Sequence, residues 1–221
     1  MTRRIITLDG PAGSGKSTVA KKLAKDLGYV YIDTGAIYRA AAIAIESSGC
    51  NVHNGEECAS VISKINIRIS GENIFLDGRN VTEEIRSHHI SEISSAIAAH
   101  PEVRRELLGI QRSFKGVSSL VAEGRDTGSV VFPDADIKFY LDADTEERVK
   151  RRYKELAAKG INISIDQLKD DLVKRDRRDS SRSVSPLSIP ENAIVVDTTH
   201  LELEEVLETI LSEIRERLPD K

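Results

Sequence analysis

The chain has 221 residues, a formal net charge of −4, and 39% hydrophobic and 31% charged residues, which suits one sizeable globular domain. The negative charge argues against general nucleic-acid binding, and no apolar run approaches the roughly 20 residues that span a bilayer. The first residues lack the apolar stretch of a signal peptide, and two cysteines are too few for a disulfide framework. We therefore expect a cytoplasmic protein with free thiols.

Short apolar runs alternate with helical periodicity along most of the chain. The predicted strands are 4–8, 29–32, 120–122, 137–141 and 194–196. The predicted helices are 16–27, 36–47, 90–114 with a break at Pro101, one capped by Asp144, one beginning near Ser164, and one ending at Leu218. This alternation predicts an α/β fold in three layers, with a five-stranded parallel sheet and right-handed crossovers.

Residues 50–90 break the pattern. Ile65, Ile67 and Ile69 alternate with polar residues, and a turn at 71–73 leads into another short apolar run. A period of two across a turn is typical of an antiparallel hairpin rather than of the main sheet. We interpret 50–90 as an inserted small antiparallel subdomain.

The stretch GPAGSGKS, residues 10–17, matches G-x-x-x-x-G-K-[ST] between a predicted strand and a predicted helix, the context of a P-loop NTPase. Its backbone N–H groups and the helix N-terminus can bind phosphate, Lys16 can reach the β- and γ-phosphates, and the Ser17 hydroxyl can ligate Mg²⁺. The predicted ATP-binding residues here are Gly10, Pro11, Ala12, Gly13, Ser14, Gly15, Lys16, Ser17 and Thr18. The sequence has no N-K-x-D signature, which disfavours a GTPase, and its length favours a small kinase.

A second group of polar residues follows the neighbouring strands. Thr34 and Arg39 come after the second predicted strand, and Arg125 and Asp126 come after the third. Because the carboxyl ends of parallel strands converge on one crevice, we expect these side chains to face the P-loop.

Five stretches, DGPAGSGKST, DTGAIYR, HPEVR, EGRDTGSVVFPDA and KRDRRDSSRSVSPL, resemble those of bacterial cytidylate kinases, which are nucleoside monophosphate kinases. The resemblance covers about residues 4–187. It implies that ATP transfers its γ-phosphoryl group to CMP or dCMP, giving CDP or dCDP and ADP, with Mg²⁺ as the cofactor. It also implies a single kinase domain over 1–221, in which 50–90 is the NMP-binding subdomain and 148–162 is a helical lid.

The resemblance assigns substrate-binding roles to Thr34, Arg39, Ser95, Arg104, Arg125, Asp126, Asp179 and Arg182. Arg39, Arg125 and Arg182 would bind the CMP phosphate, which suits planar guanidinium groups. Ser95 would contact the base and Asp179 would lie near the ribose.

Two of these residues would read the base. Asp126 would accept a hydrogen bond from the cytosine N4 amino group, and Arg104 would donate to N3 and O2. Uracil violates this pattern, and a site with unpaired polar groups can reject it strongly.

Catalysis would rest on charge and position. Lys16, Arg125, Arg151 and Arg152 would stabilise the transferred group, and Arg148 would contact ATP from the lid. The CMP phosphate is already anionic, so no general base is expected. Two alternatives stay open: another small P-loop kinase, acting on UMP, AMP or shikimate, and a P-loop module that binds nucleotide without transfer. We expect a monomer that binds neither nucleic-acid polymers nor membranes.

Overall fold

The computed structural model of the chain describes residues 3–116, 118–158, 160 and 163–218. The predicted five-stranded parallel sheet is confirmed, with the order β2-β6-β1-β7-β8 and every neighbouring pair parallel. Its strands are β1 (Ile5–Asp9), β2 (Val30–Asp33), β6 (Leu120–Gly124), β7 (Ile137–Asp142) and β8 (Ile194–Asp197). The P-loop strand β1 is therefore central, between β6 and β7.

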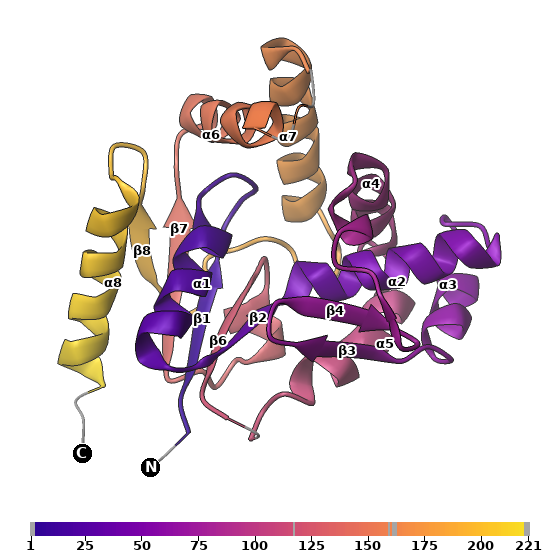
Figure 1. Cartoon of the computed structure of the whole chain (residues 1–221), viewed down its shortest axis with the longest axis horizontal. Coiled ribbons are helices and arrows are strands. Elements are labelled where there is room, and N and C mark those ends of the chain that lie inside the picture. Colours follow the sequence, from indigo (N-terminus) through magenta and orange to yellow (C-terminus); the bar gives the residue numbers. More distant parts are fainter. Residues whose placement is uncertain (1–2, 117, 159, 161–162, 219–221) are drawn as a thin grey trace.

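Helices cover both faces of this sheet, which is the predicted three-layer arrangement (Figure 1). Every residue of β1 and β6 is buried, as expected for strands covered on both faces. Helices α1 (Lys16–Leu27) and α8 (Leu203–Arg217) pack on one face. Helices α2 (Thr34–Ser48) and α5 (Pro101–Arg112), with a π-helical turn at Thr127–Val131, lie on the other.

The inserted segment contains the predicted antiparallel sheet, built from β3 (Ile67–Ser70), β4 (Asn73–Leu76) and β5 (Arg79–Asn80). It also contains a short 3₁₀ turn (Glu84–Arg86) and runs into α4 (His88–Ile97). Helix α3 (Gly55–Ile62) was not predicted. Its N-cap is Asn54, whose side chain accepts a hydrogen bond from the Glu57 amide. Asn54 followed three residues later by Glu57 is a helix-start signal that the sequence contains.

The insert does not have a hydrophobic core of its own. Buried residues of α3, β3, β4 and α4 form one cluster with α2 and α5. Cys50 and Cys58 belong to this region and are free thiols, as predicted, with their Sγ atoms 4.0 Å apart. Helix α2 therefore joins the insert to the main sheet.

Helices α6 (Thr145–Ala158) and α7 (Ile165–Ser180) lie above the carboxyl ends of the strands, on the side of the P-loop (Figure 1). The segment predicted as a lid, 148–162, covers most of α6, and its residues 159, 161 and 162 lie outside the described residues. No helix in the described part of the chain is both long and apolar enough to cross a bilayer.

Candidate active site

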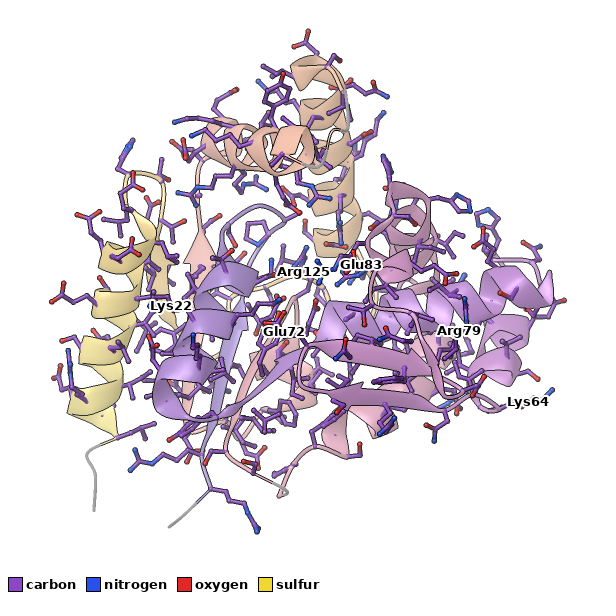
Figure 2. The ribbon with its side chains drawn as sticks, viewed as in Figure 1. Lys22, Lys64, Glu72, Arg79, Glu83 and Arg125 are labelled. Atoms are coloured by element: carbon purple, nitrogen blue, oxygen red, sulfur yellow. The ribbon has the colours of Figure 1, made fainter. Side chains whose placement is uncertain are left out.

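A single cleft of about 1980 Å³ follows the carboxyl edge of the sheet. Its lining includes residues 12–18 of the P-loop and Arg151 and Arg152 of α6. All eight predicted substrate-binding residues line the same cleft: Thr34, Arg39, Ser95, Arg104, Arg125, Asp126, Asp179 and Arg182. Figure 2 shows Arg125 near the middle of the molecule, between α1, the end of α7 and the insert. The tertiary structure therefore brings together residues that are up to about 170 positions apart in sequence.

The P-loop passes very close to the neighbouring strand β7. A Cβ atom on Gly10 would lie 2.0 Å from the carbonyl oxygen of Leu141, and the φ angle of Gly10 is +150°. Both facts require glycine at this position. The amides of the loop then turn toward the N-terminus of α1, where anions bind favourably.

Lys16 is buried at the floor of the cleft and donates a hydrogen bond to the carbonyl of Pro11 at 2.9 Å. Burial, and then the positive charge of Arg125, lower the pKa of Lys16 to about 7. An anion placed beside Lys16 would restore its proton. The lysine is thus prepared for a negatively charged partner.

Oxygen atoms gather next to Lys16. Ser17 Oγ donates to Oε1 of Glu123 at 2.6 Å, and the Tyr31 hydroxyl donates to the same oxygen at 3.2 Å. Burial, and then the charge of Asp33, raise the pKa of the Glu123 carboxyl, while Lys16 counteracts the rise. This side of the cleft combines a hydroxyl and a carboxylate at the N-terminus of α1.

Three of the predicted residues, Arg125, Asp179 and Arg182, form a buried ionic cluster that also lines the cleft. Arg125 Nε donates to Oδ2 of Asp179 at 3.0 Å, and Arg182 donates to Oδ1 of the same carboxylate. Burial alone would lower the pKa of Arg125, but the charges of Asp179 and Glu123 raise it. Burial would raise the pKa of Asp179, but Arg125 and Arg182 hold it below its usual value. Asp179 thus balances the charge of two arginines.

A second buried ion pair joins Arg104 of α5 to Asp126, which follows β6. The Arg104 guanidinium also donates to the carbonyl of Ala98 at 3.2 Å and lies over the ring of Tyr38, 5.6 Å from its centroid. An aromatic ring under a guanidinium fixes its plane. The pair presents one acceptor and several donors side by side.

The remaining predicted substrate residues are held by local partners. Arg39 pairs with Asp33 at 2.7 Å, and Asp33 also caps α2 by accepting from the Ala36 amide. The Thr34 hydroxyl donates to the carbonyl of Glu123 at 2.7 Å, and so ties the start of α2 to β6.

Ser95 is buried on α4 and receives a hydrogen bond from Arg178 of α7 at 2.8 Å. Arg178 also lies 3.7 Å from Glu92 of α4. Arg178, which the sequence did not single out, therefore links α7 to α4.

The structure places Arg148 differently from Arg151 and Arg152, the other two arginines of α6 for which a role was predicted. Arg148 is buried, donates to the carbonyls of Ala143 and Ala12 at 3.0 and 3.1 Å, and pairs with Asp176 at 2.5 Å. It packs against the P-loop backbone and does not line the cleft. Its donors are used by protein groups, and its contact with ATP stays a prediction. From sequence, a buried arginine on α6 and a cleft-facing one look alike.

Arg151 and Arg152 do line the cleft. Arg151 donates to the side chain and carbonyl of Thr198 at 2.9 and 2.5 Å, and its Nη1 would lie 3.6 Å from a Cβ on Gly15. Arg152 pairs with Glu155 at 2.6 Å.

Arg175 of α7 also lines the cleft and was not predicted. Its buried Nε has no hydrogen-bond partner among the residues that the structure describes. Burial, and then the charge of Arg125, lower its pKa to about 10. A helical signal was present, because Arg175 and Asp179 are spaced i, i+4 and so share one face of α7.

A phosphate-binding loop that faces a second group of arginines across one cleft is the arrangement of a P-loop kinase, with donor and acceptor held separately. The fold and the cleft place this chain in that class.

Comparison with known proteins makes the assignment specific. The family model described as cytidylate kinase matches residues 6–216, so the chain belongs to the cytidylate kinase family. A cytidylate kinase from Caldanaerobacter subterraneus is 48% identical over 210 residues, covering 95% of this chain and 94% of the relative. One from Polynucleobacter necessarius is 47% identical over 207 residues, covering 94% of this chain and 96% of the relative.

A solved structure of an uncharacterized protein from Eubacterium ventriosum shares the fold, with a TM-score of 0.56 and 14% sequence identity. The match covers 97% of this chain and 100% of that one.

Proposed function

We propose that the chain transfers the γ-phosphoryl group of ATP to CMP or dCMP, giving CDP or dCDP and ADP. The observation that carries the proposal is the shared cleft: the P-loop with Lys16 lines one part, and Arg39, Arg125 and Arg182 line another. The names of the relatives, cytidylate kinases, support the same acceptor.

The donor half would hold the phosphates of ATP. The amides of residues 10–18 and the positive end of α1 would bind the β- and γ-phosphates, and Lys16 would take up a proton beside them. Arg151 and Arg152 would approach from α6, which we propose as part of a lid over residues 148–162.

A magnesium ion fits next to this half. Ser17 Oγ and the Glu123 carboxylate are hard oxygen ligands 2.6 Å apart, and they lie where the phosphates would arrive. Mg²⁺ would supply charge neutralisation for the phosphates. Ser17 and Glu123 would hold it, and Tyr31 would keep the carboxylate oriented.

The acceptor half would grip a nucleoside monophosphate. An acceptor phosphate would compete with Asp179 for Arg125 and Arg182, and would release that carboxylate toward the ribose. Arg175 would add a further cation. We propose that the insert, 50–90, contributes to this binding region through α2 and α5, which share its core.

The base would be read by the Arg104–Asp126 pair. Asp126 would accept from the cytosine N4 amino group, and Arg104 would donate to N3 and O2. Uracil presents O4 to Asp126, and a carboxylate facing a carbonyl oxygen is repelled.

Transfer would need position and charge rather than proton abstraction. The attacking oxygen of CMP is anionic at neutral pH, so no general base is required. Lys16, Arg125, Arg151 and Arg152 would spread the developing charge, and closure of the lid would exclude water. We propose that the protein is cytoplasmic and that it works as a monomer.

The test is a panel of acceptors incubated with ATP and Mg²⁺, with ADP release as the readout. We expect CMP and dCMP to give the highest kcat/KM. Faster turnover of UMP, AMP or shikimate would assign a different acceptor, and ATP binding without ADP release for any acceptor would favour a non-catalytic nucleotide-binding module.

A further inference from the structure

Asp9 is a fully buried carboxylate to which the mechanism above gives no role. It ends β1 and immediately precedes Gly10, the first residue of the P-loop. Burial raises its pKa to about 6, although two backbone hydrogen bonds counteract the rise. A buried carboxylate is costly unless its oxygens are paired. Its partners therefore indicate what it does.

Both carboxylate oxygens of Asp9 accept hydrogen bonds from backbone N–H groups of the segment that follows β6. Oδ1 accepts from the Thr127 amide at 2.8 Å, and Oδ2 accepts from the Gly128 amide at 2.7 Å. These amides begin the π-helical turn that directly follows Arg125 and Asp126. One side chain thus clamps the loop that carries a phosphate-binding arginine and the base-reading carboxylate.

The packing around this clamp leaves little freedom. A Cβ atom on Gly128 would lie 2.7 Å from Thr7 Oγ1 and 3.2 Å from Asp9 Oδ2. Only glycine lets the turn approach β1 this closely. The short Asp side chain has two torsions, so its oxygens are fixed relative to the P-loop backbone.

We propose that Asp9 is a positioning residue that fixes Arg125 and Asp126 relative to the P-loop, and so joins the acceptor site to the donor site. Both ends of the link are rigid: the backbone of Asp9 leads into the phosphate cradle, and its carboxylate holds the turn after Asp126. The inference rests on the proposed function, because it needs Arg125 and Asp126 to bind the acceptor.

Asn is the informative replacement at this position. It has nearly the same shape, but it offers one acceptor oxygen and points an NH₂ group at one of the two amide donors. Asp9→Asn should therefore loosen the turn without opening a cavity.

The experiment measures kcat/KM for CMP and for UMP, with direct calorimetric titrations of CMP and of ATP. For Asp9→Asn we expect the CMP-over-UMP ratio of kcat/KM to fall about tenfold, the size expected for one hydrogen bond to a charged group. CMP binding should weaken while ATP binding stays unchanged. The matched control is Asp134→Asn, an exposed carboxylate paired with Lys115, which should alter none of these values.

A second variant, Gly128→Ala, adds a methyl group to the turn that would clash with Thr7 and Asp9, and so should push the turn away from β1. This variant tests the proposal if Asp9→Asn does not fold. It should show the same loss of base selectivity. In the double variant, the CMP-over-UMP ratio of kcat/KM should be no lower than in the more damaged single variant, because both substitutions disrupt the same contact.

Three results would overturn the proposal: an unchanged CMP-over-UMP ratio, equal losses of CMP and ATP binding, or additive effects in the double variant. A wild-type protein that does not phosphorylate CMP would instead refute the proposed function. The two failures are therefore distinguishable.

Discussion

Arg125 Nε donates to Oδ2 of Asp179 at 3.0 Å, and this ion pair connects the end of β6 to α7 inside the cleft. The Asp179 carboxylate is almost fully buried and also pairs with Arg182. It thus occupies, in the absence of substrate, the guanidinium groups that an acceptor phosphate would bind.

Asp179→Asn should destabilise the substrate-free protein. Removing one partner of a buried ion pair leaves buried charges uncompensated, and we expect a loss of about 3 kcal/mol in unfolding free energy. The pKa of Asp179 is depressed below 3.8, so its stabilisation is present above about pH 4 and is lost as the pH falls through the folded value. Denaturant unfolding at pH 7 and at acid pH measures both effects.

Millimolar phosphate should restore part of the lost stability, because an anion can take the place of the carboxylate. Asp134→Asn, which breaks an exposed pair, is the control and should cost less than about 1 kcal/mol. An Asp179→Asn protein as stable as the wild type, and indifferent to phosphate, would show that the two arginines do not depend on this residue.

Lys16→Ala should reduce transfer by at least about 10²- to 10³-fold while the protein stays folded, because one preorganised cation at the transferred group is lost. Thermal unfolding monitors the fold and ADP release monitors transfer. Full activity of this variant would remove the P-loop from the mechanism.

ATP binding should take up protons through Lys16. Its pKa is about 7 in the free protein, so at pH 8 the side chain is mostly neutral, and a bound phosphate would raise the pKa. Titration at pH 8 in buffers of different ionisation enthalpy should give uptake of close to one proton, and none with Lys16→Ala. Equal proton counts for the two proteins would mean that Lys16 is already charged.

Asp126→Ala should damage the choice of base more than the binding of ATP. Loss of the acceptor for the N4 amino group should lower the CMP-over-UMP ratio of kcat/KM by about 10- to 100-fold. Steady-state kinetics with both acceptors, and a separate ATP titration, make the measurement. If the rates with CMP and UMP fall in equal proportion, Asp126 does not read the base.

Arg148→Met should act on stability, in contrast to Arg152→Met. Arg148 is buried and its donors satisfy two backbone carbonyls and Asp176, so we expect a loss of about 2–3 kcal/mol in unfolding free energy. Arg152 lines the cleft, so Arg152→Met should mainly lower kcat. The pair of variants is compared by denaturant unfolding and by ADP release; a stable Arg148→Met protein with a raised KM for ATP would reverse our assignment.

Local patterns predicted the frame of the molecule well. The run from the first strand through the P-loop to Leu27 was placed within a residue, because a buried apolar strand, a glycine-rich turn and helical spacing are all short-range signals. The acceptor residues were predicted from topology and family resemblance, and the structure shows that they line one cleft. Helix α3 was missed, because its eight residues lie in a segment that was interpreted from the hairpin pattern further along it.

Two contacts near the site could not be predicted from local sequence, and the cause is the same for both. Asp9 stood in the first motif, yet nothing local shows that its carboxylate would meet amides 118 and 119 residues away. Arg148 and Arg152 lie on the same helix, and only packing against Ala12 decides that the first is buried.

Local sequence predicted the strands of the main sheet, most of the helices and the phosphate cradle, because these depend on neighbours within a few positions. Only the tertiary structure decided which charges pair, which arginines reach the cleft and how the turn after Asp126 is clamped to the P-loop strand. Those outcomes depend on long-range burial, since a charged group removed from water must find a partner wherever the packed fold provides one.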